Sequence, residues 1–321
     1  MNLESSLITW IQKKSGKLSS AVKLGIGDDC AVVKFSGDLI FTKDSLVEGT
    51  HFKWGYQTLF QLGRKALAVN LSDVAAMGGV PLYALVELGI PKKFSQEKIK
   101  EIYRGIFFEA KTQATTIIGG NIVTSACFWI SITLIGKSAK HFVTRSGARS
   151  HDLIGVAGYL GLATAGLHSI KRGLKGYGVL KKAYQKPCVL VGVGSVLAQK
   201  RWVHAMIDVS DGFLKDLNHV CCQSKLGAQI EITNLSIHPQ LSLWAKKNNK
   251  NVFHALLSGG EDYALLFTFP SKHLKNIHKL LKNNGILFNV LGEITPKKGL
   301  FLTQKGKPHP LPKCLGYDHF S

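Results

Sequence analysis

The chain has 321 residues, more than one hydrophobic core usually supports, so two domains are expected. Its composition is that of a globular protein, with 45% hydrophobic and 19% charged residues, and no apolar run reaches the roughly 18 residues of a membrane span. The formal net charge of +21 admits a nucleic acid, an anionic small substrate or a generally basic proteome. No zinc finger, aromatic RNA-binding signature or basic arm accompanies the lysines, so specific nucleic-acid binding is not expected.

The first predicted element is an amphipathic helix over residues 1–14, with Leu3, Leu7, Trp10 and Ile11 on one face. This segment lacks the basic stretch and apolar block of a secretory signal.

The six cysteines form no C-x-x-C pair. Adjacent Cys221 and Cys222 are poorly spaced for a mutual disulfide or for a zinc site. Reduced thiols, and with them a cytoplasmic location without a membrane segment, are therefore expected.

Further along the chain, apolar periodicity predicts a mixture of strands and helices. In chain order these are strands near 31–35 and 39–42, a helix over 59–77, a strand near 82–88, a helix over 95–113, and strands near 116–118 and 128–136. A polar run at 145–152 marks a junction between an N-terminal domain, residues 1–144, and a C-terminal domain, residues 145–321. The second half begins with the strand LIGVAG and contains helices near 160–170, 211–225 and 271–284.

The acidic residues are few, and nine of the 20 stand in short motifs rich in glycine, serine and apolar residues. The motifs are GIGDDCAVV (25–33), TKDSLVEGTHF (42–52), AVNLSDVAAMGG (68–79), AMIDVSDGF (205–213) and LLSGGEDYALLF (256–267). Carboxylates at strand ends and glycine turns, without neighbouring basic residues, indicate a cage for a hard cation such as Mg²⁺.

Each motif also has a structural interpretation. Asp28 or Asp29 fits a turn or a helix cap, Ser210 or Asp211 fits an N-cap, and GGED fits a plain turn. Asp73, inside an apolar helical pattern that ends at Gly-Gly, is hardest to explain structurally. Together the five motifs favour one site.

A Mg²⁺ cage usually faces phosphate, yet the common nucleotide frameworks are absent. The G-K-S at 136–138 lacks the first glycine of a P-loop, because Ser131 stands there. Gly192 and Gly194 lack the third glycine of a dinucleotide fingerprint, because Leu197 stands there. No H-R-D or D-F-G set appears. A nucleotide site must therefore use another framework.

The combined motifs resemble the bacterial thiamine-monophosphate kinase family, within the aminoimidazole-ribonucleotide-synthetase-like (PurM-like) superfamily. The matching stretches follow the family's order over nearly the whole chain: GIGDDCAV, D-x-L-V-E-G-x-H-F, KALAVNLSDVAAMGG, IIGGN, TRSGA, IDVSDG, SGGEDY and GYDHF. The resemblance implies a two-domain α+β fold. The N-terminal domain would have a mixed sheet with helices and the C-terminal domain would be α/β, with the active site in the cleft between them.

The resemblance also implies an activity: transfer of the γ-phosphoryl group of ATP to thiamine monophosphate, giving thiamine diphosphate. Several Mg²⁺ ions would neutralise the two polyanions. An ionised phosphate oxygen needs no general base, so no dedicated catalytic side chain is expected. The family usually forms a homodimer through strands of the N-terminal domain.

Site residues carry over by position. The Mg²⁺ ligands would be Asp29, Thr42, Lys43, Asp44, Asp73, Asn121, Asp208 and Asp211. The ATP contacts would be Tyr103, Gly120, Asn121, Arg145 and Ser210. The thiamine-phosphate contacts would be His51, Glu261 and Cys314. Arg145 would bind phosphate, for which its planar fork is apt, and Tyr103 has the alternative of a helix-face aromatic.

Three positions depart from the family pattern. Asn121 stands where an aspartate is common, keeping an oxygen but losing a charge, so one Mg²⁺ is expected to bind more weakly. Lys43 replaces a small hydroxyl residue. Cys314 or Leu315 stands where an aromatic residue is common, and Tyr317 and Phe320 are candidate substitutes.

Two alternatives stay open. One is another ATP-dependent enzyme of the superfamily with a different phosphorylated or carboxylated substrate; His51, Glu261 and the terminal GYDHF argue against it. The other is a non-catalytic descendant that binds thiamine phosphates or nucleic acid, which Asn121 and Lys43 make conceivable.

Overall fold

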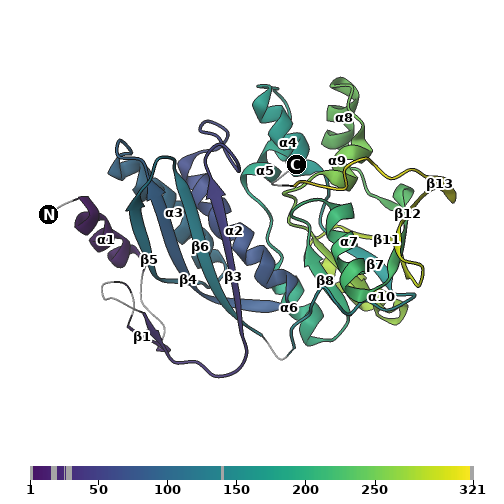
Figure 1. Ribbon diagram of the computed structural model, residues 1–321, viewed down its shortest axis with the longest axis horizontal. Helices are drawn as coiled ribbons and strands as arrows, with labels where there is room; N and C mark the ends of the chain where they lie inside the picture. Colours follow the sequence, from purple (N-terminus) through teal and green to yellow (C-terminus); the bar gives the residue numbers. More distant parts are fainter. Residues whose placement is uncertain (1–2, 16–19, 25, 27–30, 139–140, 319–321) are drawn as a thin grey trace. The chain divides into compact units, whose positions relative to one another are not determined.

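A computed structural model describes residues 3–15, 20–24, 26, 31–138 and 141–318. The chain forms two compact units (Figure 1). Unit 1 comprises Met1–Val74 and Val80–Ser138, and unit 2 comprises Ala75–Gly79 and Ala139–Ser321. None of the helices among the described residues has the length and apolar character needed to cross a membrane. The predicted domain boundary after residue 144 stays a prediction.

Unit 1 contains a four-stranded sheet. Its order is β3 (Leu39–Val47), β6 (Trp129–Ser138), β4 (Gly79–Ile90) and β5 (Thr116–Thr124). Strand β3 is antiparallel to β6, and β4 is parallel to β5. The short strands β1 (Val22–Leu24) and β2 (Val32–Val33) form a separate antiparallel pair.

The helices of unit 1 are α1 (Leu3–Lys14), α2 (Leu59–Ala76) and α3 (Gln96–Thr112), and α2 and α3 cover one face of the sheet (Figure 1). Two glycines let α2 and α3 approach closely. A Cβ on Gly63 would lie 1.9 Å from the Ile102 carbonyl oxygen, and one on Gly105 would lie 2.0 Å from that of Phe60. Any side chain at either position would therefore force the helices apart.

The predicted N-terminal helix is confirmed as α1, with Leu7 and Ile11 buried at 1% and 5% exposure and Trp10 half-buried. The Leu3 side chain lies outside the described part of the structure. The predicted helices over 59–77 and 95–113 are confirmed as α2 and α3. The strand predicted to end at residue 42 is too short, because β3 continues to Val47. The strand predicted to end at residue 118 is also too short, because β5 continues through Gly-Gly-Asn to Thr124. In both cases pairing with a neighbouring strand overrides the local polar or glycine sequence.

Unit 2 contains a seven-stranded sheet. Its order is β13 (Lys307–His309), β12 (Gly299–Gln304), β9 (Gly227–Glu231), β11 (Phe288–Thr295), β7 (Leu153–Ala157), β10 (Leu265–Phe269) and β8 (Ala205–Asp208). The β12–β9 pair is parallel and the other described pairs are antiparallel. Strands β8 and β10 are buried along their whole length, as their apolar sequences require.

The helices of unit 2 are α4 (Leu162–Lys171), α5 (Gly178–Gln185), α6 (Val191–Gln199), α7 (Phe213–Ser224), α8 (Pro239–Lys247), α9 (Val252–Ser258) and α10 (Leu274–Asn283). Short 3₁₀ turns occur at Ile232–Asn234 and Ser271–His273. The sequence prediction of helices near 160–170, 211–225 and 271–284 is confirmed by α4, α7 and α10. It misses α5, α6, α8 and α9, which are seven to nine residues long; in α6, glycines also interrupt the helical pattern.

Candidate functional site

In unit 1, β3 and α2 bring three predicted metal ligands together. Thr42 and Asp44 are two residues apart on β3, so their side chains share one face of the sheet. The Thr42 hydroxyl donates to Asp73 Oδ2 on α2 at 2.5 Å. The Asp44 backbone N–H donates to Asn70 Oδ1 at 2.9 Å, one helical turn before Asp73. These bonds fix β3 against α2, join Thr42 to Asp73, and leave Asp44 on the same face of β3 as Thr42.

The chemistry of this group suits Mg²⁺, which takes hard oxygen ligands and commonly one or two carboxylates. Asp44 is exposed and Asp73 half-buried, so both carboxylates are open to a hydrated ion. In the part of the chain that the structure describes, no three His, Cys, Asp or Glu side chains gather as a possible metal site. The predicted ligand Asp29 lies outside the described residues.

The structure places the Lys43 side chain elsewhere. Lys43 lies between Thr42 and Asp44, so strand alternation turns it to the opposite face of the sheet. Its Nζ is 3.5 Å from Glu87 Oε2, and its side chain is 56% exposed. A protonated amine has no lone pair for a metal, so only the backbone carbonyl of Lys43 can serve as a ligand.

Gly120 and Asn121 lie on β5, at the opposite edge of the sheet from β3. Asn121 is in register with Glu87, and its Oδ1 accepts the Ile122 backbone N–H at 2.9 Å. Gly120 has φ +153°, and a Cβ there would lie 1.9 Å from the Val86 carbonyl oxygen. The second glycine of G-G-N is thus required by the close passage of β5 along β4.

His51 stands in a tight loop after β3. Its Nδ1 accepts the Val47 backbone N–H at 3.1 Å, and its own backbone N–H donates to the Val47 carbonyl at 2.9 Å. Since Nδ1 is an acceptor in this assigned geometry, the neutral ring carries its proton on Nε2. His51 can therefore act as an Nε2–H donor.

Tyr103 is buried in α3, with 3% exposure and its ring 5.8 Å from that of Phe107. Burial raises the pKa of its hydroxyl. Tyr103 thus has the position of an aromatic residue on the buried face of a helix, the alternative given above. A contact between Tyr103 and ATP stays a prediction.

In unit 2, three loops lie side by side and bring five predicted site residues together. The Glu261 backbone N–H donates to the Ser210 carbonyl at 2.7 Å. The Tyr317 backbone N–H donates to the Asp211 carbonyl at 2.9 Å, and the Ser258 hydroxyl donates to the Cys314 carbonyl at 2.8 Å. The residues so gathered are Asp208, at the buried end of β8, Ser210, Asp211, Glu261 and Cys314.

The backbone of these loops is unusual. Gly212 has φ +138°, and a Cβ there would lie 2.9 Å from the Ser258 carbonyl oxygen. A Cβ on Gly260 would lie 2.6 Å from the Ser210 carbonyl oxygen. Glu261 and Tyr263 have φ +67° and +51°, a region that costs non-glycine residues free energy. Such strain is typical of functional loops that surrounding structure holds in place.

Two carboxylates support these loops, a role that the sequence analysis does not assign. Asp262 accepts the backbone N–H groups of Gly161 at 2.5 Å and Ala163 at 3.0 Å, at the start of α4. Burial raises the pKa of Asp262 to about 7, against the effect of these hydrogen bonds. Asp216 accepts the backbone N–H of Gly212 at 3.1 Å, and burial likewise raises its pKa to about 7. The sequence signal was an acid two residues, or one helical turn, after a glycine of the motif.

Arg145 is exposed and lies electrostatically close to the first half of α7. Burial, and then the positive charge of Arg145, lower the pKa of His219. The same charge opposes the raised pKa of Asp216. Beside them, Lys215 Nζ pairs with Asp211 Oδ2 at 2.8 Å. Unit 2 thus combines cationic side chains with the carboxylates of the predicted metal site, a mixture suited to phosphate and its counterions.

Comparison with known proteins shows which family the chain matches. Residues 27–138 match the family of AIR synthase related proteins in its N-terminal domain, and residues 150–305 match its C-terminal domain. The fold is therefore the predicted two-domain, α+β, PurM-like fold.

The chain is also similar to particular members. It is 31% identical over 309 residues to thiamine-monophosphate kinase of Rhodopirellula baltica, covering 93% of this chain and 92% of the relative. Thiamine-monophosphate kinase from Stenotrophomonas maltophilia superposes with a TM-score of 0.84 at 29% identity, covering 95% and 97% of the two chains. AaThiL, complexed with AMPPCP and TMP, gives 0.78 at 30% identity and covers 99% of each chain. The chain belongs to the thiamine-monophosphate kinase family of enzymes.

Proposed function

We propose that this chain transfers the γ-phosphoryl group of ATP to the phosphate of thiamine monophosphate, in a Mg²⁺-assisted reaction that yields thiamine diphosphate and ADP. The observation that carries the proposal is the hydrogen bond between Thr42 on β3 and Asp73 on α2, with Asp44 on the same face of β3 as Thr42. It is supported by the structure of AaThiL, 30% identical to this chain, in complex with AMPPCP, an unreactive analogue of ATP, and TMP.

Thr42, Asp44 and Asp73 in unit 1, and Asp208 and Asp211 in unit 2, would hold Mg²⁺ through their side-chain oxygens. When bound, the metal supplies neutralising charge for the phosphate oxygens. We add Asp29 and the Lys43 carbonyl from the family pattern. Asn121 supplies an amide oxygen where the family commonly has a carboxylate.

The remaining residues bind and orient the two substrates. In unit 2, Arg145 offers a planar, permanently charged fork to a phosphate of ATP, and Ser210 is a second nucleotide contact. In unit 1, Gly120 is a further nucleotide contact that we carry over from the family pattern. His51 donates from Nε2 to the phosphate of thiamine monophosphate, because Nδ1 is engaged with Val47. Glu261 presents a carboxylate suited to the cationic thiazolium ring, with Cys314 nearby.

No residue is assigned as a general base. The acceptor oxygen of thiamine monophosphate is already ionised at neutral pH, so alignment and charge neutralisation are enough for transfer. The protein's task is to hold the two phosphates in line and to keep water from competing.

We further propose a cytoplasmic homodimer that pairs through the strands of unit 1. Phe41 on β3 and Val123 on β5 are 63% and 38% exposed, which fits a sheet face that a second copy covers. Among the described cysteines, Cys127, Cys221, Cys222 and Cys314 form no disulfide, which fits a reducing compartment. Light scattering on the purified protein should give twice the mass of the chain.

The main experiment is an end-point assay. Purified protein with ATP, Mg²⁺ and thiamine monophosphate should yield thiamine diphosphate and ADP in equal amounts, measured by chromatography. Chelation of Mg²⁺, and replacement of thiamine monophosphate by thiamine, should each remove the product. Folded protein that gives no thiamine diphosphate above background would contradict the proposal.

A narrower experiment addresses Asn121. Restoring the carboxylate with Asn121→Asp should lower the Mg²⁺ concentration that gives half the maximal rate, because a charged ligand binds the cation more tightly. An unchanged or raised Mg²⁺ requirement would count against Asn121 as a metal-site position.

A further inference from the structure

The segment that carries Arg145 runs over residues 144–152 and has no helix or strand of its own. Its geometry therefore depends on bonds to other elements of unit 2. At its start, the Thr144 carbonyl accepts the Met206 backbone N–H at 3.1 Å, and at its end the Asp152 carbonyl accepts that of Ile294 at 2.8 Å. These two bonds attach the ends of the segment to β8 and β11.

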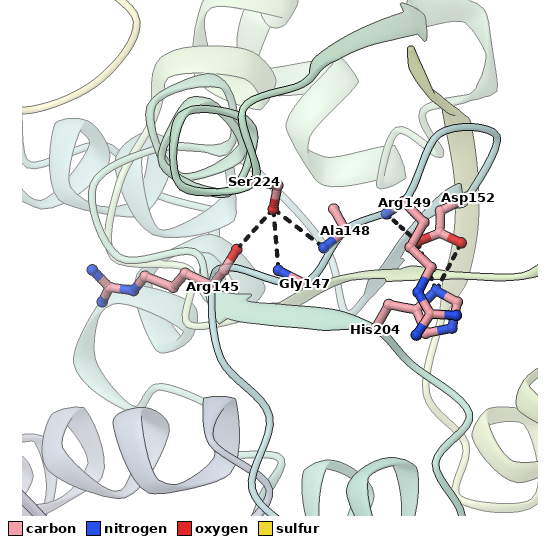
Figure 2. Close-up of polar contacts among 7 residues, drawn as sticks. All are labelled: Arg145, Gly147, Ala148, Arg149, Asp152, His204 and Ser224. Atoms are coloured by element: carbon pink, nitrogen blue, oxygen red, sulfur yellow. Dashed lines mark hydrogen bonds and ion pairs between the residues drawn. The ribbon is translucent and has the colours of Figure 1, made fainter. Parts of the chain in front are cut away.

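Ser224, the last residue of α7, holds the middle of the segment (Figure 2). Its hydroxyl oxygen accepts the backbone N–H groups of Gly147 and Ala148, both at 3.2 Å. The same hydroxyl donates to the carbonyl of Arg145 at 3.5 Å. One side chain thus engages both the residue that carries the guanidinium and the turn that follows it.

The far part of the segment is held independently. Asp152 is 3% exposed, and its Oδ2 accepts the Arg149 backbone N–H at 2.8 Å. His204 Nδ1 lies 2.9 Å from both carboxylate oxygens of Asp152. Gly147 passes so close to His204, the residue before β8, that a Cβ there would lie 2.3 Å from the His204 carbonyl oxygen. The segment is therefore fixed around Arg149 and Asp152 whether or not Ser224 is present.

Figure 2 shows the Arg145 side chain extending away from the Asp152–His204 pair, on the other side of Ser224. The Asp152–His204 contacts consequently do not orient Arg145 directly. The charge of Arg145 acts on Asp216 and His219 of α7, the helix that ends at Ser224. Helix α7 thus provides a hydrogen-bond partner for the Arg145 backbone and also the titratable groups whose pKa the Arg145 charge changes.

We propose that Ser224 is a positioning residue for Arg145: it holds the Arg145–Ala148 turn so that the guanidinium is presented to a nucleotide phosphate. This inference rests on the proposed function, in which Arg145 binds ATP. Ser224 itself touches no substrate. Its hydroxyl suits the role because a hydroxyl can accept two hydrogen bonds and donate a third.

The central variant is Ser224→Ala, which removes all three contacts and keeps the backbone. The freed turn would spend only a fraction of its time in the binding geometry, which weakens apparent affinity by that fraction. We expect KM for ATP to rise about tenfold, with KM for thiamine monophosphate changed less than twofold. Thermal unfolding should show that the variant is folded.

Two further variants separate positioning from general stability. Ser224→Thr keeps the hydroxyl and should restore KM for ATP to within about threefold of the wild type. Ser236→Ala is the matched control, because the Ser236 hydroxyl also ties a loop of unit 2 to a strand, donating to Asn289 Oδ1 at 2.6 Å. It should leave KM for ATP unchanged. If Ser224→Ala does not fold, Ser224→Cys, which keeps the volume but bonds weakly, should show the nucleotide-specific loss.

A double-mutant cycle with Arg145→Gln gives the decisive readout. If Ser224 acts through Arg145, Ser224→Ala should have no further effect on KM for ATP once the guanidinium is gone. Additive losses would overturn the inference. An equal rise in both KM values, or the same rise in Ser236→Ala, would also overturn it.

Direct binding distinguishes this inference from the proposed function. Calorimetry with AMPPCP and Mg²⁺ measures nucleotide affinity without phosphoryl transfer. Wild-type protein that binds no AMPPCP would contradict the proposed function, and with it the basis of this inference. Wild-type protein that binds AMPPCP, together with Ser224→Ala that binds it equally well, would contradict the role of Ser224 alone.

Discussion

The two units hold their predicted site residues in different ways. In unit 1, Thr42, Asp44 and Asp73 project from a regular strand and a regular helix. In unit 2, Ser210 and Glu261 lie on loops between elements. In unit 1 a side-chain bond joins Thr42 to Asp73, and in unit 2 backbone bonds join the loops.

This difference indicates what each half can tolerate. A ligand on a regular element needs only that element's packing, so unit 1 should lose function without losing its fold when a ligand changes. A ligand on a strained loop needs glycines and buried carboxylates nearby. In unit 2, therefore, changes in residues that touch no substrate should disturb both fold and function. Four predictions address this contrast, beginning with the largest expected effect.

Asp73→Asn removes one carboxylate from the unit 1 group while keeping the shape of the side chain. We expect kcat/KM to fall about 100-fold or more, because Mg²⁺ loses a charged ligand, with little change in the free energy of unfolding. Steady-state assays and urea unfolding measure the two quantities. Glu97→Gln, on the exposed surface of α3, is the control and should change neither. Activity within threefold of the wild type would remove Asp73 from the metal site.

Gly212→Ala tests whether the unit 2 loops depend on glycine. Gly212 has φ +138°, and an added Cβ would lie 2.9 Å from the Ser258 carbonyl oxygen. We expect a loss of about 2–4 kcal/mol in the free energy of unfolding. The control is Gly178→Ala at the start of α5, where a Cβ meets nothing within 4 Å. Equal stability of the two variants would mean that the loops do not need glycine.

Asp262→Asn tests the buried carboxylate beneath the Glu261 loop. Because the pKa of Asp262 is raised from 3.8 to about 7, the folded protein keeps a proton that the unfolded chain releases between these values. Asp262 should therefore make the free energy of unfolding fall as pH rises through this window, by at most about 1.4 kcal/mol per pH unit. The variant should lose this contribution, while Asp216, whose pKa is likewise raised to about 7, should keep a slope of its own.

Glu231→Gln is the control for this experiment. Hydrogen bonds from Thr233 and then from the Gly306 backbone lower the pKa of Glu231 to about 2. Its stabilisation is complete above its ordinary pKa of 4.5 and is lost as pH falls towards 2. Denaturant titrations between pH 5 and pH 7 should thus give the wild-type slope. If Asp262→Asn also keeps that slope, Asp262 ionises normally in the folded protein.

Glu261→Gly should give the smallest effect on stability. Relief of φ +67° at a non-glycine residue should raise the free energy of unfolding by about 0.5–1 kcal/mol, while KM for thiamine monophosphate rises. Glu261→Ala loses the same carboxylate but keeps the strain. Both variants should therefore bind substrate weakly, and only the glycine variant should be more stable. No difference in their urea midpoints would mean that the loop stores no strain at residue 261.

The long helices were predictable because the regular spacing of their apolar residues indicates which face is buried. Helices α2 and α3 follow this pattern closely. Asp73 is an acid in the apolar stretch of α2, and this alone makes it a candidate metal ligand without any tertiary information. The short helices α6 and α9 were not predictable, because two turns with glycine or few polar residues carry little periodic signal. Their helical state comes from packing rather than from local preference.

Individual acids were harder to interpret. Glu261 and Asp262 are adjacent in sequence but have different roles. The Asp262 carboxylate accepts backbone N–H groups at the start of α4, whereas Glu261 lies on the loop beside Ser210. Lys43 lies among predicted ligands in sequence, and strand alternation directs its ammonium to Glu87 on the other face. The local sequence predicts neither of these two contacts.

The sequence by itself determined the order of the motifs, the helical placement of Asp73 and the family to which the chain belongs. These depend on residue identity and local spacing alone. Only the tertiary structure decided that Thr42 meets Asp73 and that Asp216 and Asp262 are supports. It likewise decided that Ser224 reaches the turn after Arg145. Such contacts join residues up to about a hundred positions apart, and long-range packing sets them.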